Sequence, residues 1–574
     1  MPHQRHRERR FIVCVAGTDQ FWQISALPRF VKNTLARRTS LEYISARSSA
    51  SLRLDQGIQL GVSSETSGGI FMSDTKQTSA DAAAHGELAK SIGTWQVFAA
   101  GVALVVASTT LVSDFQGYFA LGLAFAMAIF VAFIMNLLLG LSVAELATEY
   151  PKAGALYEYG HEIFGGVIGK FLGIFLAFTF VGMFVFAGAG ETSAGGFGLQ
   201  ALFNQSANLN WYIVALTILA VIPNIFGIRT AAWVSAVLLV GMLGIRWFFG
   251  LAGFLGFSDA TSWSSSNLDT GGPGSFDWFG SGGLLAAGLV LGFWTFVGIE
   301  FVAPLAEEVR NPRRQMVVGI VIGLFVILGT SLLMGLGVGG TQPEPGVTWA
   351  EITITEGAEC GGSCPQLIVG EAMFGGAGRG LMALASVMAT LGSMTVAFAA
   401  IPRMIFGIAR EGNFFGPLSK PFAKLHPRYD TPVLATILFA SMAGLAALFS
   451  SDVVDWIYAG AYVWLLIYAA YHLLLLSNRI LRPENERRLL GNAGWGIGVF
   501  GFIVTIVALY YAFLGAHGFF AKKAAWVIGF ALLASIVAFL LPGDVHEDHK
   551  VNRRPSRVEE KKLSESNSST AVTD

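Results

Sequence analysis

Long apolar stretches recur along most of this chain, and short polar segments separate them. A window of roughly 20 apolar residues can cross a hydrocarbon core of about 30 Å as a helix. Backbone amides in lipid must be satisfied within their own segment, so such windows form helices. The pattern predicts an all-α polytopic membrane protein with about 12 transmembrane helices. We expect them at 93–117, 119–146, 166–201, 210–226, 231–257, 282–303, 315–340, 379–402, 432–449, 453–477, 494–514 and 524–542.

Both ends of the chain are polar and contain no window of this kind. We therefore expect disordered tails over residues 1–88 and 544–574. Two interpretations of the N-terminal tail stay open. Its arginine-rich beginning is compatible with a targeting segment, whereas the sequence from Met72 resembles a short polar leader and indicates a natural start there.

Positive charge is distributed unevenly between alternate loops. The outer loops hold Arg379, Lys522 and Lys523, whereas the inner loops hold many more cations. Since cytoplasmic loops carry an excess of lysine and arginine, the pattern predicts a cell-membrane protein with both termini in the cytoplasm. The inner residues are Lys152, Arg229, Arg310, Arg313, Arg314, Arg403, Arg410, Lys420, Lys424, Arg428, Arg479, Arg482, Arg487 and Arg488.

Composition agrees with this class and excludes others. Apolar residues make up 53% of the chain and charged residues 13%, whereas soluble domains carry about a quarter charged residues. We expect a lipid bilayer as partner and no nucleic acid. The chain has three cysteines, too few for a disulfide framework or a multi-thiolate metal site. We predict no metal and no cofactor. Cys360 and Cys364 lie in an outer loop and are equally compatible with a disulfide and with two free thiols.

Two of the predicted helices are interrupted by small or polar residues, at 105–110 and at 292–298. Each opens a set of five helices, which predicts repeat one at 93–257 and repeat two at 282–477, within a core at 89–480. Two further helices follow within 481–543. Paired broken helices indicate a binding site near the membrane midplane. The candidate substrate-binding residues are Val106, Ala107, Ser108, Thr109, Phe293, Trp294, Thr295, Phe296 and Gly298.

Several motifs near the inner ends of these helices form a recognisable set. They are Phe293–Glu300 with Ala306–Arg313, Glu145–Ala147 with Pro151–Tyr157, Ala400–Arg403 with Ala409–Gly412, and Pro427–Pro432. Over residues 93–480 the chain resembles the amino acid, polyamine and organocation (APC) permease superfamily. The resemblance implies a LeuT-like fold with a 5+5 inverted repeat, a substrate held between helices 1 and 6, and alternating access. It implies a secondary active transporter of an amino acid or a small organic amine, the alternative being a channel or nutrient sensor of the same fold.

The chain departs from this superfamily in helix 1. Members that bind α-amino acids usually carry a glycine-rich step whose amides take the carboxylate, whereas this chain has Val106-Ala107-Ser108-Thr109. Glycine lets a ligand approach the backbone closely, so its absence argues against that mode of binding. The following Ser113-Asp114-Phe115 is similar to ethanolamine permeases, and an amine substrate therefore stays open.

Four ionisable residues lie within the predicted helices, where charge is costly and usually faces a cavity or a partner. Glu300 is predicted to be a gate or coupling residue, the alternative being a structural hydrogen bond, and Asp114 either meets an amine or caps a half-helix. Glu191 has an amine or proton role or is an interfacial carboxylate. Arg246 is a fixed cation at the site or a structural ion-pair partner, because arginine does not release its proton. A coupled proton is a candidate partner.

Two further possibilities are weighed and not adopted. The hydroxyls of Ser386, Thr390, Ser393 and Thr395 would suit sodium, but small residues also permit close helix packing, so no sodium site is predicted. His161-Glu162 lacks the second histidine of a zinc protease motif, and neither a phosphate-binding loop nor a nucleophile elbow is present. The sequence therefore predicts no enzyme.

Overall fold

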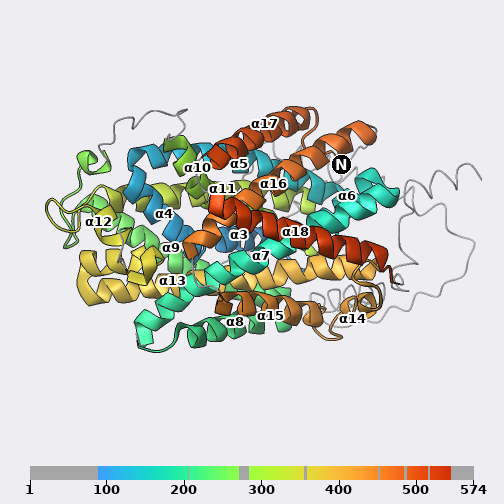
Figure 1. The fold of residues 1–574 in the computed structure, drawn as a ribbon, viewed down its shortest axis with the longest axis horizontal. Coiled ribbons are helices and arrows are strands. Elements are labelled where there is room, and N and C mark those ends of the chain that lie inside the picture. Colours follow the sequence, from blue (N-terminus) through green and yellow to red (C-terminus); the bar gives the residue numbers. More distant parts are fainter. Residues whose placement is uncertain are drawn as a thin grey trace, which may run out of the picture. The chain divides into compact units, whose positions relative to one another are not determined.

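The computed structural model describes residues 88–203, 206–269, 284–354, 359–449, 453–483, 488–514 and 518–543. The tails predicted at 1–88 and 544–574, with Met72, lie outside this part of the chain except for Leu88. The described residues form helices joined by loops, and most helices run along one common direction (Figure 1). The prediction of an all-α polytopic membrane protein is confirmed.

The spans agree with the sequence pattern. Among the described residues nine helices are long and apolar enough to cross a membrane, the bent pair α3–α4 makes a tenth, and α8 and α15 are shorter apolar helices. Together they correspond to the predicted segments. They are α3 (Thr94–Val105) with α4 (Ser108–Leu121), α5 (Leu123–Glu149), α7 (Gly166–Phe203), α8 (Leu209–Ile225), α9 (Ile228–Leu255), α10 (Leu284–Trp294) with η2 (Ile299–Glu308), α11 (Pro312–Gly339), α13 (Pro365–Arg410), α15 (Val433–Phe449), α16 (Val453–Leu481), α17 (Ala493–Leu514) and α18 (Gly518–Leu540).

Three details differ from the prediction. The segment predicted at 379–402 is part of α13, which begins at Pro365 and has a kink at Phe374 and Gly375, where Gly375 has a positive φ of 58°. Arg403, Arg410 and Arg479 lie inside helices and are buried, although the prediction placed them in loops. Short helices also occupy loops, namely α6 (Leu156–Phe164), α12 (Trp349–Thr353), α14 (Ser419–Phe422), η1 (Ser265–Leu268), η3 (Glu359–Gly362) and η4 (Gly416–Leu418).

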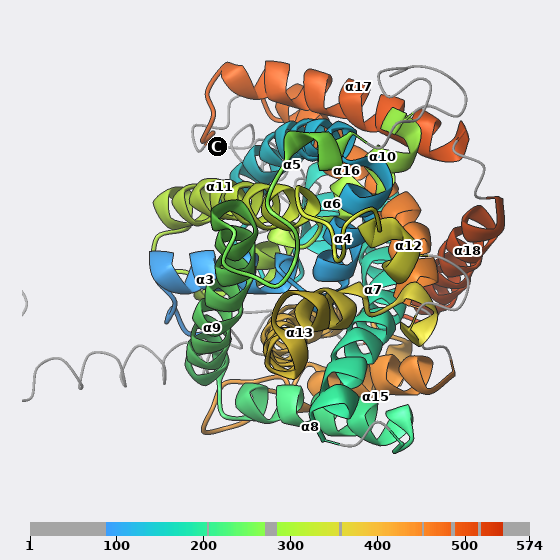
Figure 2. The same cartoon turned by 90° about the vertical axis from the view of Figure 1, so that its left-hand side faces the viewer.

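The helices differ in how much of their surface other helices cover. All residues of the apolar window in Gly288–Glu308 are buried, against 28% of the windows in α17 and in α18. Figure 2 shows α17 and α18 at the rim of the bundle, with α8 and α15 along another edge. The two broken helices open the two predicted repeats, whose boundaries and inverted relation stay a prediction. The core of the fold therefore surrounds the broken segments.

The segment before α13 settles the question about the cysteines. Cys360 and Cys364 form a disulfide, so the open choice resolves in favour of the bridge. Next to it, the Arg379 side chain forms ion pairs with Glu359 and Glu371. This segment also contacts α4, since the Gln116 Nε2 atom donates a hydrogen bond of 2.9 Å to the Gly362 carbonyl.

Three buried arginines tie the helices together at the end of the bundle that carries the predicted inner loops, which we call the inner end. Arg403 of α13 bonds to Glu308, and Arg479 of α16 bonds to Glu145 of α5. Arg410 of α13 donates two hydrogen bonds of 2.9 Å to the two carboxylate oxygens of Glu307. Bidentate, charge-assisted bonds of this kind fix both partners. Ion pairs between buried side chains therefore hold the inner ends of α5, η2, α13 and α16 together.

Candidate functional site

The first break separates α3 from α4 by two residues and bends the helix by 55°. Val106 has a ψ of 46°, and Ala107 is extended with a ψ of 170°. Backbone groups that lose their helical hydrogen bonds at the break have other hydrogen-bond partners. The Thr110 hydroxyl donates to the Val105 carbonyl at 2.5 Å, and the Ser108 amide bonds to the side chain of Glu191. The run of serine and threonine after the valines thus replaces helical hydrogen bonds that the break removes.

Glu191 of α7 closes the start of α4. One oxygen of its carboxylate accepts from the Ser108 amide at 2.8 Å, and the other accepts from the Thr109 amide at 2.9 Å. The hydroxyls of Thr390 and Ser393 on α13 also donate to this carboxylate, at 2.9 and 3.0 Å. A carboxylate at a helix N-terminus is stabilised by the free amides and the helix dipole. The protein's own Glu191 side chain therefore binds the amides to which, by the family resemblance, a ligand carboxylate would bind.

The second break follows α10 and covers Thr295 to Gly298. Gly298 has a φ of 128°, and a Cβ atom there would lie 2.3 Å from the Leu104 side chain, so this position requires glycine. The Gly298 amide donates to the Glu300 carboxylate at 3.0 Å. Trp464 Nε1 and Tyr468 of α16 also donate to it, the tyrosine hydroxyl at 3.2 Å. Glu300 thus joins the second break to α16.

Asp114 and Arg246 come together on the outer side of the first break. Asp114 Oδ1 accepts from the Thr295 hydroxyl at 2.8 Å and from the Ser331 hydroxyl of α11 at 3.0 Å. The Arg246 Nη2 atom lies 4.0 Å from Asp114 Oδ2, and both side chains are 3% exposed. This small group of residues joins α4, the second break, α9 and α11. The structure brings together four segments that are distant in sequence.

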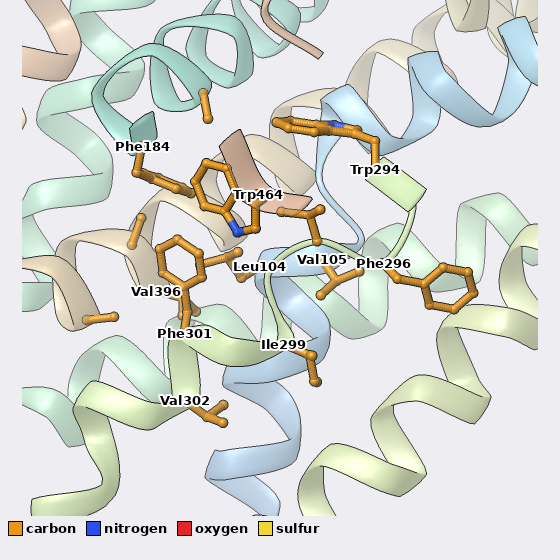
Figure 3. Close-up of a cluster of buried hydrophobic side chains, with 14 of the residues drawn as sticks. Leu104, Val105, Phe184, Trp294, Phe296, Ile299, Phe301, Val302, Val396 and Trp464 are labelled. Carbon is orange, nitrogen blue, oxygen red and sulfur yellow. The ribbon is translucent and has the colours of Figure 1, made fainter. Parts of the chain in front are cut away.

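Aromatic side chains pack beside the two breaks, next to the aliphatic Leu104, Val105 and Ile299 (Figure 3). The Trp294 ring lies edge-on to Trp464 with 6.3 Å between their centroids, and Phe301 stacks on the other side of Trp464 at 6.1 Å. A Cβ atom on Gly460 of α16 would lie 2.3 Å from the Trp294 ring, so the absence of a side chain at Gly460 makes room for this tryptophan.

The candidate residues are closed off from both ends of the bundle. Every predicted site residue is buried. At the inner end the amides of Ser91 and Ile92 donate to the Glu308 carbonyl, so residues before α3 lie along the loop after η2. At the outer end Trp349 of α12 stacks on Phe119 of α4 at 5.5 Å. In the described part of the chain these contacts cover the candidate residues at both ends.

The sequence did not single out Trp464, Tyr468 or Asn136, which complete the surroundings of Glu300. The Tyr468 hydroxyl lies 2.9 Å from the Asn136 side-chain oxygen of α5. A signal was present, because an asparagine within an apolar span is costly and usually has a polar partner. The roles predicted for Glu300, Asp114, Glu191 and Arg246 stay predictions.

Comparison with known proteins gives one consistent result. Residues 92–539 match the family model described as amino acid permease. The chain is 25% identical over 356 residues to the vacuolar cationic amino acid transporter 4 of Arabidopsis thaliana, covering 57% of this chain and 53% of that protein. Cationic amino acid transporter 4 of Mus musculus is also 25% identical, with 61% of this chain and 52% of that protein covered.

An uncharacterized transporter of Mycobacterium tuberculosis is 25% identical over 438 residues, covering 75% of this chain and 90% of that protein. The chain spans about half the length of the two cationic amino acid transporters that it matches.

Proposed function

Since the chain belongs to the amino acid permease family, we propose that it is a secondary active transporter that moves an amino acid or a small organic amine by alternating access. One observation carries this proposal. Two broken helices face each other in the most buried part of the bundle, and Asp114, Glu191, Glu300 and Arg246 gather around the breaks. Buried charge within a membrane marks a ligand or ion pathway.

The proposal gives each part of the site a role. The substrate lies between Val106–Thr109 of the first break and Phe293–Gly298 of the second. Trp294 closes over it, because it ends α10 directly before the second break, its ring lies against Trp464 and Gly460 leaves it room. Glu300 links this gate to α16 and is the candidate for gating or proton coupling. Asp114 and Glu191 are the further acidic groups that an amine or a proton meets.

A channel or nutrient sensor of the same fold is the alternative function. The buried side chains that fill the space between the breaks favour a covered binding site over a continuous pore. The names of the relatives favour transport, and no observation on the described residues favours an enzyme. We place the protein in the cell membrane with both termini in the cytoplasm, a proposal that rests on the charge difference between the loops.

Uptake by purified protein in liposomes tests the proposal. Liposomes with the full chain and liposomes without protein receive radiolabelled amino acids and amines, with and without an imposed proton gradient. We expect saturable accumulation of at least one compound in the protein liposomes. Uptake that rises linearly with concentration would support the channel instead. Binding without any uptake would support the sensor, and accumulation that ignores the proton gradient would exclude proton coupling.

A further inference from the structure

Arg246 differs from the other arginines buried in the described part of the chain. Arg403, Arg410 and Arg479 each bond to a carboxylate, and each is at most 3% exposed. Arg246 is 2% exposed, yet it donates no hydrogen bond to a described residue, and its Nη2 atom is fully enclosed. A buried guanidinium without hydrogen-bond partners is strongly destabilising. The energetic cost indicates that an anionic partner binds here in another state of the protein.

The facing carboxylate is also incompletely bonded. Asp114 accepts two hydroxyl hydrogen bonds, from Thr295 and Ser331, and both go to its Oδ1 atom. The Oδ2 atom accepts none from a described residue and faces Arg246 Nη2 at 4.0 Å. A carboxylate oxygen has lone pairs for about two hydrogen bonds. One free acceptor and one free donor thus lie side by side.

The other place where a ligand carboxylate could bind, the start of α4, is already occupied by a side chain. The amides of Ser108 and Thr109, at the start of α4, bond to Glu191, which also takes hydroxyl hydrogen bonds from Thr390 and Ser393. A ligand carboxylate would have to displace a group of the same charge that already has four donors. The free hydrogen-bonding capacity lies instead at Arg246.

We propose that Arg246 binds the carboxylate of the substrate and that Asp114 Oδ2 accepts from its ammonium group, so that the pair takes the zwitterionic head group of an α-amino acid. This inference rests on the proposed transport function. The two groups separate when the substrate enters, and each then exchanges a weak contact for a charge-assisted hydrogen bond. The amine that corresponds to each amino acid lacks the carboxylate and leaves Arg246 unpaired, so it binds more weakly.

Matched ligand pairs test the inference. Thermal stabilisation of the purified full chain is measured with serine and ethanolamine, lysine and cadaverine, and leucine and isoamylamine, because a ligand that binds the folded state raises its melting temperature. We expect the wild type to prefer the amino acid of one pair over the amine by about 10-fold to 100-fold. Arg246→Gln should abolish this preference and leave the amine affinity within about threefold, and Arg246→Lys should restore part of it.

The control is Arg229→Gln, which removes an exposed arginine from the same helix and should leave the preference intact. If Arg246→Gln weakens the binding of amino acid and amine equally, or weakens the binding of neither, Arg246 is a structural partner of Asp114 and the inference fails. Should that variant not fold, the wild type is tested with each amino acid and its methyl ester, and equal affinities overturn the inference. A wild type that binds and takes up none of these compounds overturns the proposed function as well.

Discussion

The inner end of the bundle and the space around the two breaks both bury arginine, but only the inner arginines hydrogen-bond to a carboxylate. At the inner end the Glu307 carboxylate accepts hydrogen bonds from both Nη atoms of Arg410 and from the amides of Leu88 and Ala153. Around the breaks, Arg246 and Asp114 Oδ2 face each other at 4.0 Å without a hydrogen bond. The arginines of the two regions are thus similarly buried but differ in how many hydrogen bonds they donate.

This difference separates structural charge from functional charge. A fully bonded ion pair fixes its helices, because removing one partner leaves the other buried and uncompensated. An incompletely bonded pair contributes less to stability and keeps hydrogen-bonding capacity for a ligand. Three of the buried arginines are thus explained by folding, whereas for Arg246 we propose a role in binding.

The largest expected effect is the loss of a bonded arginine. Arg479→Gln leaves the fully buried Glu145 without its cation, which should lower the free energy of unfolding by about 3–5 kcal/mol. Arg246→Gln should change it by less than half as much, because losing the contact with Asp114 is offset by removing a buried guanidinium that has no hydrogen-bond partner. Melting temperatures of both variants in detergent, measured by size-exclusion chromatography after heating, check this. Equal losses would contradict the comparison, since they would show that Arg246 is bonded as well as Arg479.

The second effect concerns the tryptophan that lies above the site. Trp294→Ala should lower uptake by about tenfold or more while expression changes little, because a gating aromatic acts by covering the ligand transiently. Gly460→Ala is the matched variant. It keeps the indole but places a Cβ atom 2.3 Å from the ring, so the ring must move, and uptake should fall without a new cavity. If Trp294→Ala loses expression and uptake in proportion, Trp294 is a packing residue.

The membrane helices could be predicted from the sequence, and most of the loop structure could not. Apolar length alone locates α5, α7, α9 and α11, because lipid requires each span to form its own hydrogen bonds. The same rule does not predict Pro365–Phe374, the part of α13 before its kink. The sequence pattern assigned this segment to a polar outer loop, where the bilayer does not require a helix. The kink depends on Gly375, whose positive φ a hydropathy pattern does not indicate.

The site could be predicted only in part. Small and polar residues at 105–110 and 292–298 located both breaks, and the four ionisable residues were visible as costly groups in apolar spans. Which of them pair could not be derived, since Glu191 meets Ser108 across 83 positions of sequence and Arg246 meets Asp114 through the packing of separate helices. Trp464 and Tyr468 lie in an apolar helix pattern that gives no sign of their hydrogen bonds to Glu300.

A smaller effect is expected for the carboxylate that closes the first break. Glu191→Gln keeps the size of the side chain but places an amide NH2 group against one of its donors. Losing one hydrogen bond to a charged acceptor should lower the free energy of unfolding by about 1.5–3 kcal/mol. Hydrogen exchange at the Ser108 and Thr109 amides should accelerate at the same time. Unchanged exchange would show that α4 holds its first turn without Glu191.

The smallest effect on stability, and the most informative for coupling, is expected at Glu300, whose surroundings are intermediate between the two regions. Its carboxylate has three donors, the Gly298 amide, Trp464 and Tyr468, but none of them is a cation. Glu300→Gln preserves the shape, and with its NH2 group toward Trp464 Nε1 it loses one of the three bonds, so we expect the melting temperature to fall no further than in Glu191→Gln. If Glu300 exchanges a proton during transport, the variant must lose that step, and uptake should depend less on pH.

Uptake measured between pH 5 and 8 in liposomes, with Arg229→Gln as control, checks this pH dependence. A variant with the wild-type pH profile would make Glu300 a structural residue and leave Glu191 and Asp114 as the carboxylates to test for coupling.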